Sequence, residues 1–203
     1  MDIDVLAKYA KYFGLGVKTG VELPSEVAGS VASRETAEKN NHSWQPGDMM
    51  SAVIGQSYNA FTPLQMAKYI SMVANGGNKI TPTILESVIR ADGTEVPKEE
   101  VEQTIKAKLG ITDDGTEDLT ISQTSIDVVK EGMRSVTSDE SGTAYSVFKN
   151  FPIEVGGKTG SAETESGANN GKTNAWFAGF APYDDPEIAV VVFVENRSSP
   201  CSI

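Results

Sequence analysis

The sequence predicts an α+β protein in which an antiparallel sheet is flanked by helices. Three strand-like runs follow Pro152 in quick succession, at residues 155–163, 175–181 and 188–195. The connections between them are too short for crossover helices, so neighbouring strands are expected to be antiparallel. Upstream of Pro152, several segments place apolar residues at helical spacing, which indicates helices with one buried face.

The length and composition are those of a soluble globular protein. At 203 residues the chain fits one domain or a large part of one. Hydrophobic residues make up 39% and charged residues 22%, and no apolar run approaches the length of a membrane span. The formal net charge of −11 argues against nucleic acid as a partner.

Four segments are predicted to be helical. Apolar residues recur at helical spacing over residues 4–13, and a second helix is expected to begin at Thr62, which suits the N-cap, with Pro63 at the first helical position. A short amphipathic helix is expected around residues 101–109 and a longer one over residues 125–136. The residues expected to face the core are Leu64, Ala67, Ile70, Ser71 and Ala74 in the second helix, Val101, Ile105 and Leu109 in the third, and Ile126, Val129, Met133 and Val136 in the fourth.

Two other segments carry weaker signals. Residues 83–89 are strand-like, and Asp92-Gly93 is expected to form a hairpin turn toward residues 94–96. Residues 28–48 are polar and irregular, and no element is predicted there.

The first of the three strands carries a candidate binding site. Lys158 offers a cation, Thr159 and Ser161 offer hydroxyls, and Gly160 has no side chain to hold another molecule's backbone away. Such a strand can bind a peptide carboxylate and present a backbone N–H to an oxyanion. We therefore predict that Lys158, Thr159 and Ser161 lie along an exposed edge strand. A second Lys-Thr-Gly, at residues 18–20, follows two glycines and runs into a proline, so we expect it in a loop without a role in the site.

With these residues in place, the chain resembles the transpeptidase domain of penicillin-binding proteins, and in particular the class B, monofunctional type. The resemblance extends from about residue 7 to residue 195 and rests on motifs that occur in the family's order. These motifs are Phe13-Gly14-Leu15-Gly16, Thr19-Gly20-Val21-Glu22-Leu23-Pro24, Ile54-Gly55-Gln56, Thr62-Pro63-Leu64-Gln65-Met66-Ala67, Asn75-Gly76-Gly77, Gly142-Thr143-Ala144, Gly157-Lys158-Thr159-Gly160-Ser161-Ala162-Glu163 and Trp176-Phe177-Ala178-Gly179-Phe180-Ala181-Pro182.

The resemblance implies the fold shared by penicillin-binding proteins and serine β-lactamases, and a peptidoglycan D,D-transpeptidase activity. In that family a serine attacks the carbonyl of the penultimate D-Ala of a stem peptide and releases the last D-Ala, and the acyl group then passes to an amine of a neighbouring strand. β-Lactams imitate the D-Ala-D-Ala end. By resemblance, Lys158 and Thr159 are catalytic, and Lys158, Thr159, Gly160 and Ser161 bind the substrate, with the Ser161 N–H as half of the oxyanion hole. No cofactor or metal is implied, and the single His42 and single Cys201 make no metal site.

The sequence departs from the family at the nucleophile. The family's Ser-x-x-Lys and Ser-x-Asn motifs precede the Phe-Gly-Leu-Gly motif, whereas here only 12 residues precede Phe13. Ser146-Val147-Phe148-Lys149 and Ser57-Tyr58-Asn59 fit these patterns at the wrong places, and we interpret both matches as accidental. We therefore expect residues 1–203 to be a partial transpeptidase domain, without the nucleophile-bearing part and the terminal helix, and inactive on its own.

Two alternatives stay open. One is a non-catalytic module that binds peptidoglycan peptides, and the other is a β-lactam sensor, which shares the Lys-Thr-Gly motif but usually not the Thr-Pro-Leu-Gln-Met-Ala helix. For the parent protein, the resemblance implies the extracytoplasmic face of the bacterial plasma membrane and an anchor outside this chain. The isolated chain is expected to associate with itself, because apolar surface and strand edges would be exposed.

Overall fold

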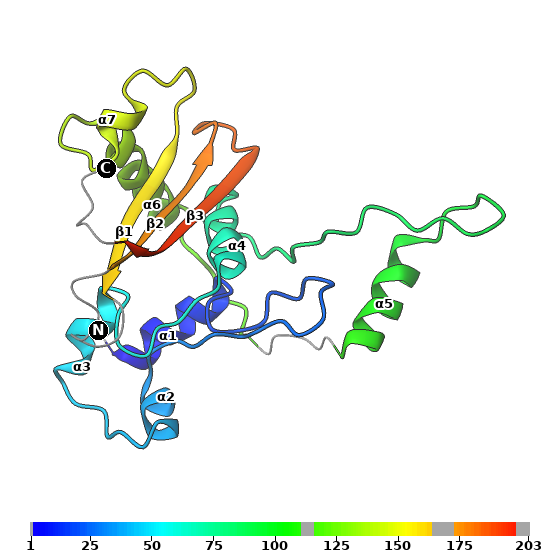
Figure 1. The fold of residues 1–203 in the computed structure, drawn as a ribbon, viewed down its shortest axis with the longest axis horizontal. Helices are drawn as coiled ribbons and strands as arrows, with labels where there is room; N and C mark the ends of the chain where they lie inside the picture. The colour runs from blue at the N-terminus through cyan, green and yellow to red at the C-terminus, as the bar shows by residue number, and fades with distance from the viewer. Residues whose placement is uncertain (1, 111–115, 164–172, 198–203) are drawn as a thin grey trace.

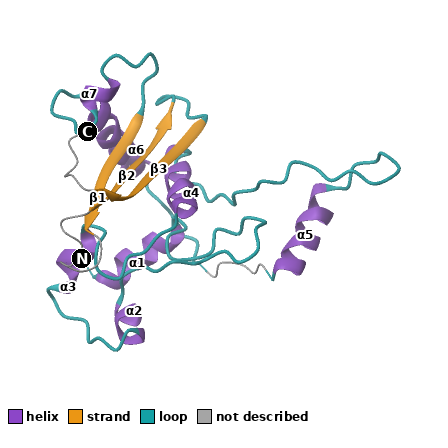
Figure 2. Ribbon diagram, in the orientation of Figure 1, coloured by secondary structure: helices purple, strands orange, loops and turns teal. Residues whose placement is uncertain are grey.

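The computed structural model describes residues 2–110, 116–163 and 173–197 (Figure 1). Within these ranges it contains seven helices and a three-stranded antiparallel sheet of order β1-β2-β3 (Figure 2). The predicted α+β class is confirmed. The elements are α1 (Ile3–Tyr12), α2 (Arg34–Lys39), α3 (Asp48–Val53), α4 (Pro63–Ala74), α5 (Lys98–Leu109), α6 (Gln123–Ser138), α7 (Tyr145–Phe148), β1 (Gly156–Glu163), β2 (Thr173–Ala181) and β3 (Ile188–Arg197).

Helices α4 and α6 cover one face of the sheet. Lys158, Ala178 and Val191 lie opposite one another across β1, β2 and β3, and successive residues along each strand alternate between the two faces. Ala178 and Phe180 of β2 pack against apolar residues of both helices, and Phe180 is only 1% exposed. The helix residues of this core are Ile70, Val73 and Ala74 of α4 and Met133 of α6. Burial of these apolar side chains between the sheet and the two helices fixes the position of the strands relative to α4 and α6.

The opposite face of the sheet is largely apolar and open along β3. Ile188, Val190, Val192 and Val194 point to this face and are each between 47% and 61% exposed. Phe177 of β2 lies on the same face, and its ring stacks on Phe148 of α7 at 5.5 Å between centroids. Helix α7 therefore covers Phe177 of β2 on this face, and β3 stays uncovered by the described residues.

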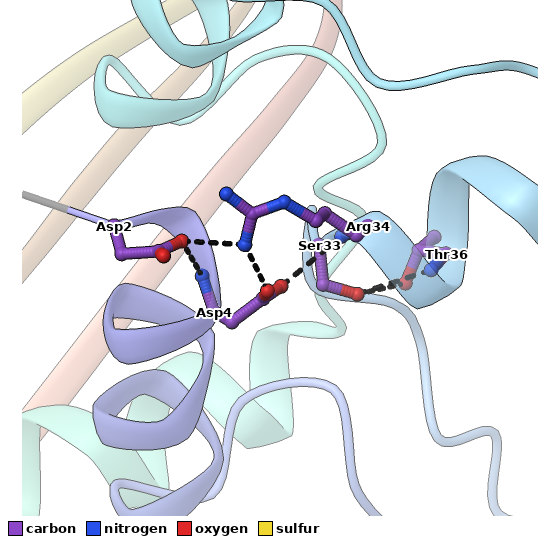
Figure 3. Close-up of polar contacts among 5 residues, drawn as sticks. All are labelled: Asp2, Asp4, Ser33, Arg34 and Thr36. Carbon is purple, nitrogen blue, oxygen red and sulfur yellow. Dashed lines mark hydrogen bonds and ion pairs between the residues drawn. The ribbon is translucent and has the colours of Figure 1, made fainter.

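The N-terminal ends of α1 and α2 are tied together by a charged cluster (Figure 3). Arg34 of α2 pairs with Asp2, the N-cap of α1, at 2.7 Å, and also with Asp4. The hydrogen bond from Arg34 holds the pKa of the Asp2 carboxyl below its usual value. Ser33 caps α2 by accepting a hydrogen bond from the Thr36 N–H at 3.0 Å. Residues 28–48, for which the sequence predicted no element, therefore contain α2, and α3 begins at their last residue.

Helix α4 begins where the sequence predicts, at a capping box formed by Thr62 and Gln65. Its buried face differs from the prediction, because Leu64, Ala67 and Ser71 are only partly buried whereas Gln65 is fully buried. The Gln65 side chain donates to the carbonyls of Val17 and Ala28, both at 2.7 Å, and accepts from the Thr62 N–H at 2.8 Å. This one amide therefore fastens the loop of residues 17–29 to the start of α4.

A long arm formed by residues 79–110 and 116–118 projects from the body of the protein and carries α5 on the part that returns from its far end (Figure 1). The predicted strand over residues 83–89 is wrong. The segment is extended, but it forms only an isolated bridge between Ile89 and Glu95 around the predicted turn at Asp92 and Gly93. An ion pair of 2.8 Å between Lys79 and Asp118 joins the two ends of the arm. The predicted amphipathic helix is present as α5, with Val101 buried and Ile105 and Leu109 partly buried.

Two further differences concern α6 and α7. Val129 was expected to face the core from α6 but is 45% exposed, and Thr137 is buried instead. The short helix α7 was not predicted, because a four-residue helix has too few residues to show a period. The three strands agree with the predicted ones to within two residues at each end.

Candidate functional site

The four candidate residues Lys158, Thr159, Gly160 and Ser161 all lie in β1. Among the described strands β1 pairs only with β2, so it forms one edge of the sheet. Lys158 and Ser161 are exposed, and Thr159 and Gly160 are partly buried. The prediction of an exposed edge strand is confirmed.

The open edge of β1 carries backbone groups that could serve a ligand. The Lys158 ammonium donates a hydrogen bond to the Thr159 carbonyl oxygen at 2.5 Å. In an antiparallel strand, the N–H and C=O of one residue point to the same edge, and residues two apart share that edge. The Thr159 carbonyl and the Ser161 N–H therefore face the open edge together, with the Lys158 ammonium beside them.

The start of β1 is fixed by the end of α6. The Thr137 hydroxyl contacts the carbonyl of Val155 at 2.5 Å and that of Arg134 at 2.9 Å. Glu154, which directly precedes Val155, forms an ion pair of 2.6 Å with the Arg134 side chain of α6. These contacts set the position of β1 relative to α6 and hence the place of the candidate residues.

Thr143, in the loop after α6, contacts the candidate site directly. Its Oγ1 lies 2.7 Å from Oγ1 of Thr159. The sequence singled out Gly142-Thr143-Ala144 as a motif of the family but gave Thr143 no role. A contact between two hydroxyls 16 residues apart depends on how a loop meets a strand, which no local pattern encodes.

The glycines of β1 differ in what surrounds them. A Cβ on Gly157 would lie 2.8 Å from Cζ of Phe177 and 3.3 Å from Cγ2 of Thr137, so the fold itself requires a glycine there. A Cβ on Gly160 would meet only Cβ of Trp176, at an ordinary 3.5 Å. The packing of the described residues therefore has room for a side chain at Gly160.

The other matches to the Ser-x-x-Lys and Ser-x-Asn patterns lie outside β1. Ser146 is in α7 and Lys149 is its C-cap, and both are exposed. Ser57 follows α3, and the Asn59 amide is engaged by backbone groups, donating to Ala52 O and Gln56 O and accepting from Ala32 N. Asn59 thus holds a loop together.

The second Lys-Thr-Gly lies in a loop, as predicted. Thr19 is buried, and its backbone N–H and hydroxyl both donate to Glu26, at 2.7 Å and 2.5 Å. Lys68 of α4 donates to the Thr19 carbonyl at 3.3 Å. This copy of the motif organises the loop against α4.

Metal ligands do not cluster in the part of the chain that the structure describes. His42 lies in a loop, as expected, and its Nε2 is 2.8 Å from Oδ2 of Asp48. Hydrogen bonds from the Gln45 N–H and from His42 lower the pKa of Asp48. Cys201 lies outside the described residues. Over the same described ranges, every helix is too short or too polar to cross a membrane.

A sheet backed by helices, with a Lys-Thr-Gly-Ser sequence on its edge strand, is typical of the serine acyltransferases that recognise penicillin. A family model, the penicillin binding protein transpeptidase domain, matches residues 1–200. The chain belongs to this family.

Curated relatives support the same assignment. The peptidoglycan D,D-transpeptidase MrdA of Haemophilus influenzae is 32% identical over 100% of this chain, which spans 31% of that protein. Penicillin-binding protein H of Bacillus subtilis is 36% identical over 96% of this chain, which spans 26% of that protein. The chain therefore spans about a third or less of these relatives. The relatives confirm the expected resemblance to class B enzymes.

Solved structures agree in fold. Pseudomonas aeruginosa PBP2, in complex with WCK 5153, has a TM-score of 0.77 and 30% identity, covering 97% of this chain and 40% of that one. Penicillin-binding protein 3 of Mycobacterium tuberculosis, complexed with ampicillin, has a TM-score of 0.67 and 25% identity, covering 92% and 38%. The transpeptidase fold is thus shown by sequence and by structure.

Proposed function

We propose that this chain provides the substrate-binding edge strand of a peptidoglycan D,D-transpeptidase that works through an acyl-serine intermediate. The observation that carries the proposal is the arrangement of Lys158, Thr159 and Ser161 along the open edge of β1. The partner is then a stem peptide ending in D-Ala-D-Ala, and the relatives' role in bacterial peptidoglycan synthesis supports a place in the cell envelope.

Each of the four residues has a chemical task in this proposal. The Lys158 ammonium and the hydroxyls of Thr159 and Ser161 bind the terminal carboxylate, since charge-assisted hydrogen bonds are the strong ones. The Ser161 N–H donates to the oxyanion that forms on the attacked carbonyl, and loss of one such donor costs about 2.7–4 kcal/mol in the transition state. Gly160 leaves room for the peptide backbone beside the strand. With the serine, Lys158 and Thr159 take part in proton transfer.

The same strand would bind β-lactams, because their carboxylate takes the place of the peptide's. The structure of the M. tuberculosis relative with ampicillin supports this extension. The domain is proposed to be partial, with the acylated serine and the membrane anchor supplied outside these 203 residues.

A non-catalytic binding module is the second candidate. The environment of Asn59 favours it for the chain alone, because the amide of the Ser57-Tyr58-Asn59 match is engaged by three backbone groups. The edge strand would then bind a peptide carboxylate without catalysing acyl transfer. Sequence upstream of Met1 separates the two: Ser-x-x-Lys and Ser-x-Asn motifs there support the transpeptidase, and a reading frame without them supports the module.

The 203-residue chain is expected to form no covalent adduct with penicillin. Acylation needs a serine activated by a neighbouring lysine and a second oxyanion donor. Neither Ser146 nor Ser57 stands where the order of the family's motifs would place such a serine. Incubation with a fluorescent penicillin, followed by denaturing electrophoresis and intact mass measurement, tests this. A stable adduct mapped to Ser146 would show that its Ser-x-x-Lys match is a real nucleophile. Labelling that appears only when the chain is extended upstream supports the partial domain.

The isolated chain is also expected to associate with itself. The outer face of β3 exposes four aliphatic side chains, and among the described strands its outer edge has no partner. Light scattering at tens of micromolar should give a mass above that of the monomer, and Val192→Lys should lower it. A monomer under these conditions would contradict the expectation.

A further inference from the structure

The Gly142-Thr143-Ala144 segment is held tightly against the end of α6. A Cβ on Gly142 would lie 2.5 Å from the Ser135 carbonyl oxygen and closer still to that of Val136. Ala144 has 0% exposure, and its N–H donates to the Val136 carbonyl at 3.0 Å. Only glycine and a small residue fit at these two positions, so the segment follows one path and Thr143 is carried at a fixed place.

The same end of α6 also holds the start of β1. Thr137, one residue after Val136, bonds to the Val155 carbonyl at 2.5 Å, and the strand continues from there to Thr159. Thr143 and Thr159 are thus attached to one helix end by two separate segments. The distance of 2.7 Å between their hydroxyl oxygens follows from this common support.

We propose that Thr143 is a positioning residue that orients the Thr159 hydroxyl toward the ligand. A hydroxyl has one proton to donate and two lone pairs to accept with. If Thr159 donated to Thr143, it would turn only lone pairs toward an anionic ligand. When Thr143 donates to Thr159, the Thr159 proton is left for a carboxylate, and the two bonds strengthen each other.

The inference rests on the proposed function, because the ligand is the terminal carboxylate of a peptide. It adds a residue outside β1 to the site. It also explains why the segment carries a hydroxyl between two positions that are set by packing. Valine has nearly the shape of threonine but no hydroxyl, whereas serine keeps the hydroxyl, so these two substitutions separate shape from hydrogen bonding.

The experiment compares the chain with Thr143→Val, Thr143→Ser and Thr104→Val, the last a substitution of an exposed threonine in α5 of the arm, away from the sheet (Figure 1). Titration with N-acetyl-D-Ala-D-Ala is followed by the NMR shift of the Ser161 amide, and three-bond couplings report the Thr159 χ1 rotamer. Thr143→Val should weaken binding about three- to tenfold, as the loss of one hydrogen bond does. It should also mix the Thr159 rotamers. Thr143→Ser and Thr104→Val should bind within twofold of the original chain.

The carboxamide analogue of the dipeptide, which lacks the terminal charge, is the matched ligand. Its affinity should respond little to Thr143→Val, because the inferred role concerns the carboxylate. Unchanged dipeptide affinity in Thr143→Val, or equal losses for valine and serine and for both ligands, would overturn the inference and leave the proposed function in place. If neither the original chain nor the chain extended upstream binds the dipeptide or penicillin, the proposed function fails and the inference with it.

Discussion

Replacement of Gln65 by methionine is expected to lower the free energy of unfolding by about 2–4 kcal/mol, because the substitution leaves several polar backbone groups without their partner. The carbonyls of Val17 and Ala28 lose a donor, and the Thr62 N–H loses an acceptor. Methionine has a similar volume and helix propensity, so the loss reports the hydrogen bonds. Urea unfolding at a fixed low protein concentration measures it, with an unchanged slope as the sign that only stability has changed.

Gln103→Met in α5 is the matched control, since Gln103 is an exposed glutamine within a helix. A surface substitution of this kind should change the free energy by less than about 0.5 kcal/mol. If Gln65→Met and Gln103→Met were equally stable, the Gln65 amide would not be the fastening between the loop and α4.

Alanine at Gly157 and at Gly160 should have opposite consequences. A methyl group at Gly157 would press on the Phe177 ring, whose displacement would disturb its stacking on Phe148, so Gly157→Ala should cost about 1–3 kcal/mol of stability. Gly160→Ala should leave stability unchanged or raise it by about 0.5 kcal/mol, because alanine restricts the unfolded chain. Its effect should appear in ligand binding, with N-acetyl-D-Ala-D-Ala bound about tenfold more weakly, or about 1.4 kcal/mol.

Thermal unfolding measures the stability of Gly157→Ala and Gly160→Ala, and the NMR titration of the Ser161 amide measures their affinity for the dipeptide. Each variant is the control for the other, since both add the same methyl group to the same strand three residues apart. Equal losses of stability would contradict the packing around Gly160. Unchanged dipeptide binding by Gly160→Ala would argue against passage of a peptide backbone beside this residue.

The parts of the fold with strong local signals could be predicted from the sequence. The start of α4 is encoded by Thr62 and Pro63, and β3 by its run of β-branched residues. The short connections between the three strands indicate that they are antiparallel neighbours. The buried face of α4 could not be predicted, because the polar residues Gln65 and Lys68 are buried there and donate hydrogen bonds to carbonyls of a loop. An apolar pattern cannot reveal a polar residue whose partners come from a distant loop.

In the candidate site, too, the features with local sequence signals could be predicted and those that depend on distant contacts could not. Lys158, Thr159, Gly160 and Ser161 were predicted to share an edge strand, because they are consecutive in the sequence and the strand alternation is local. The contact of Thr143 with Thr159 was not predicted, since it depends on the close approach of Gly142 to the end of α6. The difference between Gly157 and Gly160 likewise needs the Phe177 ring in place.

The ion pair between Lys79 and Asp118 brings the two ends of the arm together. A loop whose ends already meet can be lengthened or shortened at small entropic cost, because closure depends only weakly on loop length. The turn at Asp92 and Gly93, which is exposed near the far end of the arm, is therefore a suitable place to insert a fluorophore-binding tag or an affinity epitope. Such an insertion would report on the protein without touching the sheet, and a short linker from 79 to 118 would give a smaller protein for crystallisation.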